Sequence, residues 1–184
     1  LPPDINHSYD GFTVEEGGIR FGLAAVKNIG RGFIQSVVRE RKEGPFTSLR
    51  DFCTRMAGGD LNKRAMENLI RSGAFDSLGA RRSQLCKVYE TVMDSIAESR
   101  RQNVEGQMDF FSMAADNDEK SNSVKEIPLP DIPEYTPEEL MTMEKATTGL
   151  YLSGHPMDHY RDAVRKLHAP TIVSIIEDFS RENG

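Results

Sequence analysis

The stretch from Lys27 to Gly32 holds the residues of this 184-residue sequence whose types and spacing best suit binding chemistry. It lies between two segments with apolar residues at helical spacing, and a tight hairpin between packed helices needs residues that accept a positive φ. Backbone N–H groups at the start of the second helix then point outward, where the helix dipole also favours an anion such as phosphate. An ordinary helical hairpin whose glycines only make the turn explains these residues equally well. The candidate residues are Lys27, Asn28, Ile29, Gly30, Arg31 and Gly32.

A second unit of the same kind centres on Gly73 and ends at Asp76. It is a weaker match, because it has one glycine and a bulky Phe75, which fits a core better than a platform for stacked bases. Arg81 and Arg82 follow at the start of the next helix and are placed to reach a second phosphate backbone. Two such units side by side would suit the two strands of a duplex bound without sequence preference.

A short motif with two adjacent aromatic residues follows the long basic region. Two neighbouring aromatics at the edge of a polar, acidic stretch are typical of a linear motif that anchors in an apolar pocket of a partner. The alternative is that both rings fold back on the chain's own helices. The residues of this motif are Gln107, Met108, Asp109, Phe110 and Phe111.

Several kinds of site are absent from the pattern. The four histidines have no carboxylates or cysteines at metal-ligand spacing, and no Ser/His/Asp set, phosphate loop or dinucleotide fingerprint occurs. We therefore expect no catalytic residue, cofactor or metal site. Two cysteines are too few for a disulfide framework and suit a reducing compartment, here the cytoplasm. No apolar run approaches the ~18 residues that a membrane-spanning helix needs, so we expect no membrane partner.

Charge is divided unevenly along the chain. The formal net charge of −6 argues against a nucleic-acid partner when taken as a whole. Residues 1–19 carry −4, residues 20–105 carry +6 and residues 106–184 carry −8. A basic block between two acidic ones predicts a polyanion partner for the middle block, residues 20–105.

The elements that must position these groups are mainly helical. Residues 12–22 alternate like a short β-hairpin, with Gly17 and Gly18 at its turn. A proline-rich acidic linker is expected over residues 112–136, with some extended structure at 128–133. Apolar spacing and capping residues predict a short helix from residue 23 and helices over residues 31–44, 48–58, 61–72, 81–101, 137–149, 157–167 and 172–179.

Seven short motifs in this order resemble the DNA polymerase III alpha-subunit family, the C-family replicative polymerases of bacteria. No single motif is specific, but their order is, and together they span nearly the whole chain. Asn28 stands where the family's hairpin usually has glycine, and Phe110 stands where clamp-binding motifs more often have leucine. The motifs are Leu1–Asn6, Ile19–Gly30, Gly44–Phe52, Leu61–Arg64, Gly73–Asp76, Gln107–Phe111 and Gly149–Pro156.

The resemblance implies an internal piece of a larger polymerase with four parts. They are the end of the fingers with a β-hairpin (1–22), a tandem helix-hairpin-helix domain that binds DNA (23–105), a clamp-binding motif with an acidic linker (106–136), and a helical connector toward an OB domain (137–184). The implied partners are double-stranded DNA, the sliding clamp and, through the parent chain, other replicase subunits. The carboxylates that hold magnesium for nucleotidyl transfer lie upstream of such a piece, so the polymerase activity belongs to the parent enzyme.

Two other classes of function remain open. The first is the helix-hairpin-helix domain of a DNA repair enzyme, a ligase or a nuclease, which leaves Gln107–Phe111 unexplained. The second is an acidic protein-interaction module without a DNA role, which predicts no binding to duplex at any salt concentration.

Overall fold

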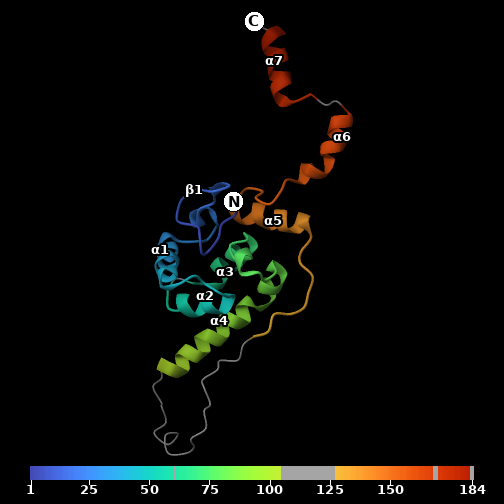
Figure 1. Cartoon of the computed structure of the whole chain (residues 1–184). Helices are drawn as coiled ribbons and strands as arrows, with labels where there is room; N and C mark the ends of the chain where they lie inside the picture. Colours follow the sequence, from blue (N-terminus) through green and yellow to red (C-terminus); the bar gives the residue numbers. More distant parts are fainter. Residues whose placement is uncertain (60, 105–126, 168–169, 183–184) are drawn as a thin grey trace, which may run out of the picture. The chain divides into compact units, whose positions relative to one another are not determined.

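The structure is a computed structural model that describes residues 1–59, 61–104, 127–167 and 170–182 (Figure 1). The chain divides into two compact units, Leu1–Ser153 and Gly154–Gly184. Helices dominate, and a two-stranded antiparallel hairpin lies near the N-terminus, as the sequence predicts. The first unit contains β1 (Thr13–Glu15), β2 (Gly18–Arg20), η1 (Leu23–Ala25), α1 (Arg31–Glu40), η2 (Arg41–Glu43), α2 (Leu49–Met56), α3 (Lys63–Arg71), η3 (Asp76–Leu78), α4 (Arg82–Val104) and α5 (Pro137–Thr148).

The predicted hairpin and helix starts are confirmed at their capping residues. Gly17 and Gly18 turn the hairpin at φ of 100° and 143°, values that a side chain would oppose. Ser48 Oγ accepts a hydrogen bond from the Asp51 N–H at 3.0 Å and so starts α2. Thr136 and Glu139 form a reciprocal capping box at α5, with Pro137 in its first turn.

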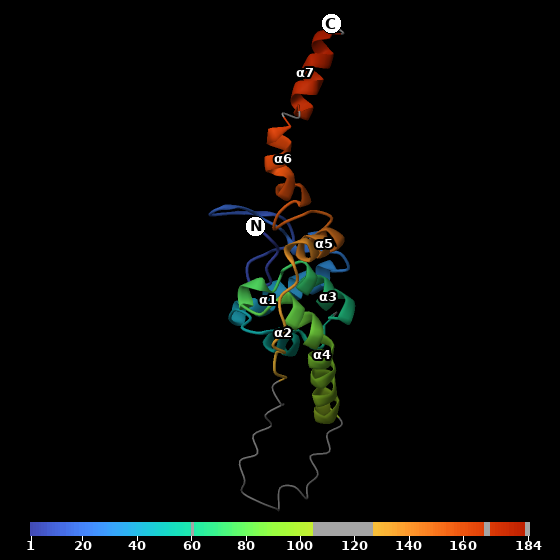
Figure 2. The same ribbon diagram turned by 90° about the vertical axis from the view of Figure 1, so that its right-hand side faces the viewer.

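One apolar core joins the helices of the first unit. The ring of Phe52 lies at its centre, with the rings of Phe46 and Phe75 at centroid distances of 4.8 and 5.0 Å in edge-on geometry. Each fully buried ring of this size contributes about 1.5–3 kcal/mol by leaving water. Helices α1 to α4 supply most of the rest of this core, and Figure 2 shows these four helices close together. The fully buried large side chains include Leu23, Ile34, Val37, Met66, Leu69 and Ile70.

The N-terminal residues belong to this core and do not stand apart from it. Ile5 is 0% exposed, and its N–H donates to the carbonyl of Ala74 at 3.0 Å. Asn6 exchanges two hydrogen bonds with the backbone of Phe46. The expected boundary at residue 22 therefore does not coincide with a boundary of the fold.

Residues 127–135 form an extended strap along the first half of α4, where the sequence predicts mostly linker. Ile127 packs against the core, and Gln84 Nε2 donates to the carbonyl of Pro130 at 2.8 Å. The carboxylate of Glu134 accepts from the N–H groups of Arg82 and Ser83 at 2.6 and 2.9 Å. The strap is ordered because it satisfies N–H groups that the first turn of α4 leaves without partners. Residues 112–126 of the predicted linker lie outside the described residues.

Helix α5 also belongs to the first unit, although the sequence assigns it to a connector. It packs on α3, and the division between the units falls after Ser153. Residues 154–184 contain η4 (Pro156–Tyr160), α6 (Arg161–Lys166) and α7 (Ile172–Glu182), close to the predicted helices. His155 Nδ1 accepts from the Met157 N–H at 3.1 Å, so this histidine caps η4. Within the described ranges, no helix is both long and apolar enough to cross a bilayer.

Glu134→Gln tests the strap through pH. Burial raises the pKa of Glu134, but hydrogen bonds from the N–H groups of Ser83, Tyr135 and Arg82 outweigh this and lower the pKa below its usual value. A lowered folded-state pKa gives stability above the unfolded value of about 4.3, which is lost as pH falls through the folded value. Urea unfolding at pH 7 should show a loss of about 1 kcal/mol in the variant.

The difference between wild type and Glu134→Gln should shrink as the pH falls below 4.3. Asp131→Asn is the matched control, since the Asp131 side chain is on the same strap and is fully exposed. A Glu134→Gln difference that stays constant down to acid pH would contradict the cap.

Candidate nucleic-acid interface

The hairpin between η1 and α1 takes its left-handed residue from asparagine. Asn28 has a φ of 63°, a conformation that asparagine tolerates better than other side chains with a Cβ. Gly30 and Gly32 could also accept a positive φ, but neither adopts one. Gly30 caps α1 at a φ of −81°, and Gly32 lies in the first turn of the helix.

Gly30 leaves the N-terminus of α1 accessible to a ligand. A Cβ built at this position meets no atom within 4 Å, and residues 27, 28 and 30–32 are exposed. The bond from the Ile34 N–H to the carbonyl of Gly30, 3.1 Å long, is an early bond of the helix. The N–H groups of residues 31–33 therefore have no acceptor within the helix and point toward its open end. This geometry suits an anion, and the exposed Arg31 lies beside it.

Lys27 is fixed by two elements that the local sequence does not indicate. Its N–H donates to the carbonyl of Thr147 at 2.9 Å, and its Nζ donates to the carbonyl of Ala146 at 2.7 Å. Asn68 Nδ2 of α3 donates to the carbonyl of Lys27 at 2.8 Å. Ile29 packs against the core beneath the hairpin, as its apolar side chain predicts.

The second hairpin is turned inward. Gly73 has a φ of 86° and is buried, and a Cβ there would overlap the guanidinium of Arg82. Phe75 is 0% exposed and belongs to the core, as expected. Glycine is required here because another side chain packs against the turn, so Gly73 does not present its backbone to a phosphate.

Arg82 is buried and holds the second hairpin in place. Its guanidinium is bonded to the carboxylate of Asp76 at 2.6 Å and to that of Glu144 at 3.1 Å. Burial lowers the pKa of Arg82, but the bonds to Asp76 and Glu144 outweigh it and raise the pKa, so the group stays charged. The predicted contact between Arg82 and DNA does not fit a side chain that is paired inside the fold. Arg81 is exposed, but its Nη1 donates to the carbonyl of Ile132 in the strap at 2.7 Å.

Glu144 completes this cluster from α5. It is 0% exposed and accepts from the N–H groups of Leu152 and Ser153 at 3.0 and 2.9 Å. These bonds fold the chain back after α5, where Gly149 turns at a φ of 84°. The sequence shows a break at this place, but it gives no sign that a buried carboxylate organises it.

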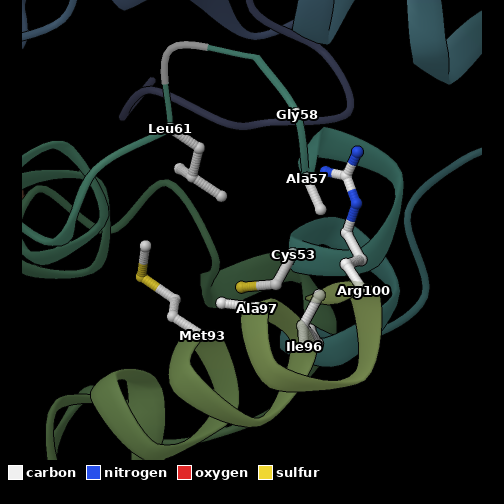
Figure 3. A pocket seen from close by; sticks show the side chains of 8 residues that line it. All are labelled: Cys53, Ala57, Gly58, Leu61, Met93, Ile96, Ala97 and Arg100. Atoms are coloured by element: carbon white, nitrogen blue, oxygen red, sulfur yellow. The ribbon is translucent and has the colours of Figure 1, made fainter. Parts of the chain in front are cut away.

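The apolar cavity beside Cys53 shows no reactive chemistry. Cys53 lines an apolar cavity of about 150 Å³ between α2 and α4, with Met93 and Ile96 opposite and Arg100 at its rim (Figure 3). Burial raises the pKa of Cys53 to about 12, which keeps the thiol protonated. Among the residues that the structure describes, no three His, Cys, Asp or Glu side chains form a group that fits a metal ion. The Gln107–Phe111 motif lies outside the described residues.

Comparison with known proteins confirms the resemblance drawn from the seven motifs. A family profile described as "Helix-hairpin-helix motif" matches residues 1–85. The chain is 40% identical over 169 residues to a DNA polymerase III subunit alpha of Chlamydia pneumoniae, covering 91% of the chain and 13% of that protein. The corresponding protein of Xylella fastidiosa strain Temecula1 is 37% identical, with 91% and 14% covered. That of Pseudomonas aeruginosa is 35% identical, with 95% and 16% covered. The chain thus spans about one seventh of the length of these relatives.

Arg82→Met tests whether the buried cluster holds the fold. Methionine keeps the volume but leaves the Glu144 carboxylate buried without its cation, so the free energy of unfolding should fall by about 3–5 kcal/mol. Arg81→Met, the exposed neighbour, should cost about 0–1 kcal/mol. Urea denaturation of the two variants measures both values. Equal losses in the two would refute the role assigned to Arg82.

Proposed function

Since the chain is similar, over nine tenths of its length, to one segment of DNA polymerase III alpha subunits, we propose that it binds the backbone of duplex DNA for such a replicative polymerase. The observation that carries this proposal is the open N-terminus of α1, where unpaired N–H groups, a helix dipole and Arg31 come together at the Lys27–Gly32 hairpin. These groups recognise phosphate and carry no information about base sequence. Binding should therefore be salt-sensitive and independent of sequence.

The second part of the proposal is docking on the sliding clamp through Gln107–Phe111. Its support is the sequence of the motif and the similarity of the chain to DNA polymerase III alpha subunits. Two weak contacts on one chain raise the local concentration of polymerase at the primer end, and this would increase processivity.

Nucleotidyl transfer with magnesium belongs, in this proposal, to the parent enzyme. The supporting observation is that the chain spans 13–16% of the relatives' lengths. Other replicase subunits would be reached through that parent chain, in the cytoplasm. Among the described residues, no group of three His, Cys, Asp or Glu side chains fits a metal ion.

A DNA repair enzyme would also explain the helix-hairpin-helix motif, but this alternative would predict relatives other than polymerase subunits. The relatives reported above are DNA polymerase III alpha subunits, which favours a polymerase over a ligase or nuclease. An acidic interaction module without a DNA role would give no duplex binding even at low salt, and the titrations below separate it from both.

Gly30→Asp tests the phosphate site with little effect on folding. Aspartate is a favoured N-cap residue and the position is open, so α1 should be as stable or more stable. Its carboxylate would occupy the place proposed for phosphate and repel DNA. We expect at least a tenfold loss of affinity for a labelled duplex, measured by fluorescence anisotropy. Gly30→Ser, a neutral N-cap, is the matched control and should bind nearly as wild type does; equal binding by both variants would remove the hairpin from the interface.

Phe110→Ala/Phe111→Ala tests clamp docking independently. Removing both aromatic anchors should abolish binding to purified sliding clamp in surface plasmon resonance, because such anchors supply most of the energy of a short motif. Duplex binding by this variant should be unchanged. Gly30→Asp is its reciprocal control and should bind the clamp normally. Retention of clamp binding by the double alanine variant would exclude the motif.

A further inference from the structure

The burial of Gly73 and Arg82 argues against the predicted second anion site, and exposed basic side chains occur on α3 and α5, the two helices that contact the Lys27–Gly32 hairpin. We propose that Arg64 of α3 and Lys145 of α5 flank the Lys27–Gly32 hairpin and form with it one basic surface for the backbone of duplex DNA. This inference rests on the proposed function, because it assumes that the hairpin contacts DNA. It adds two contact residues from elements outside the hairpin.

Arg64 is placed beside the hairpin by Asn68. The Asn68 amide donates to the carbonyl of Lys27 at 2.8 Å, so this face of α3 lies against the hairpin. Arg64 precedes Asn68 by four residues on the same helix, and side chains at this spacing have Cβ atoms about 5–6 Å apart on one face. Arg64 is exposed. A long guanidinium side chain there extends the basic surface along α3.

Lys63, the neighbour of Arg64, does not share this role. Its Nζ is bonded to Asp94 at 2.9 Å and to Glu90 at 3.3 Å, both on α4. The ammonium is thus directed toward two carboxylates, on the side of α3 that meets α4. On the same helix, Glu67 is paired with Arg71 at 2.9 Å. This pairing reduces the repulsion that Glu67 would exert on a phosphate near Arg64.

Lys145 is placed by the contact between Lys27 and the end of α5. The last carbonyls of a helix carry partial negative charge, which would repel a phosphate. Lys27 donates to two of them, those of Ala146 and Thr147, and so reduces this negative charge. Lys145 is exposed in the same turn, with its Nζ 5.2 Å from the centre of the Tyr151 ring. The end of α5 therefore places a positively charged side chain, that of Lys145, next to the hairpin.

The occupant that fits this surface is a polyanion with regularly spaced charges. The hairpin, α3 and α5 each offer a cation, and contacts from three separate elements suit phosphates along a duplex better than a single small anion. Each cation that neutralises a phosphate displaces counterions, so it contributes to the salt dependence of binding.

The test measures that salt dependence with the 184-residue chain. A labelled duplex of arbitrary sequence is titrated with wild type, Arg64→Gln, Lys145→Gln and the double variant at several salt concentrations. Each single variant should weaken binding about threefold to tenfold at low salt. Each should also reduce the slope of log K against log salt concentration by about 0.9, and the double variant by about twice that.

Two controls keep the outcomes distinct. Lys42→Gln, an exposed lysine on η2 beyond the far end of α1, should leave affinity and slope unchanged. Arg64→Lys should preserve the slope, which a merely structural role of the arginine would not predict. Thermal unfolding confirms that the variants are folded.

Unchanged slopes in both neutral variants, with loss of binding in Gly30→Asp, would overturn this inference and leave the proposed function standing. Unchanged binding in Gly30→Asp as well would overturn the proposed function itself. A slope reduced by Lys42→Gln as much as by Arg64→Gln would show a diffuse charge effect and also overturn the inference.

Discussion

The arrangement of the first unit depends on the two ion pairs that the buried guanidinium of Arg82 forms. It lies at the start of α4 and binds the carboxylate of Asp76 after the second hairpin and that of Glu144 in α5. The side chains of Arg82 and Glu144 are only 6% and 1% exposed, so both have lost most of their hydration. Such a pair is stable only when its geometry is good and its remaining hydrogen-bonding atoms have partners. Here Glu144 has those partners in the N–H groups of Leu152 and Ser153.

The same contact reaches the candidate DNA surface through α5. Because Glu144 is anchored on Arg82, the last turn of α5 lies where Lys27 can bond to the carbonyls of Ala146 and Thr147. The two hairpins thus have different tasks, although their sequences look alike. The second hairpin packs against the Arg82–Glu144 ion pair, which positions α5. Helix α5 in turn fixes Lys27 of the first hairpin, and the N-terminus of α1 beside that hairpin stays exposed.

Local patterns in the sequence predicted the helices and most of the core well. Apolar spacing identified the buried faces of α2, α3 and α4, and the capping residues Ser48 and Thr136 marked helix starts correctly. These signals are local, since a cap or a helix face depends on residues three or four positions apart. The order of seven short motifs indicated a resemblance to DNA polymerase III alpha subunits, and comparison found the same similarity over 91% of the chain.

What the sequence did not show depends on contacts between distant residues. Asn68, Ala146 and Glu144 have no local feature that links them to Lys27 or Arg82, and Lys27 and Ala146 are 119 positions apart. The strap was predicted mainly as linker because prolines and acids are typical of linkers. In the structure, however, the Glu134 carboxylate accepts a hydrogen bond from the Arg82 N–H at the N-terminus of α4. Arg82 was expected on the surface because arginine usually lies there, and only the buried Glu144 reverses that expectation.

The strap also has a consequence for how the chain can vary in length. It brings residue 127 back alongside α4, so the two ends of the intervening stretch, 105–126, are attached to one rigid element. Closing a loop between fixed ends costs entropy that grows only with the logarithm of its length, about 0.6 kcal/mol for each doubling. Insertions or deletions between Val104 and Ile127 would therefore change the stability of the helical unit very little. Gln107–Phe111 lies in this stretch, so its separation along the chain from α4 and from the strap can change while the packing of the helices is preserved.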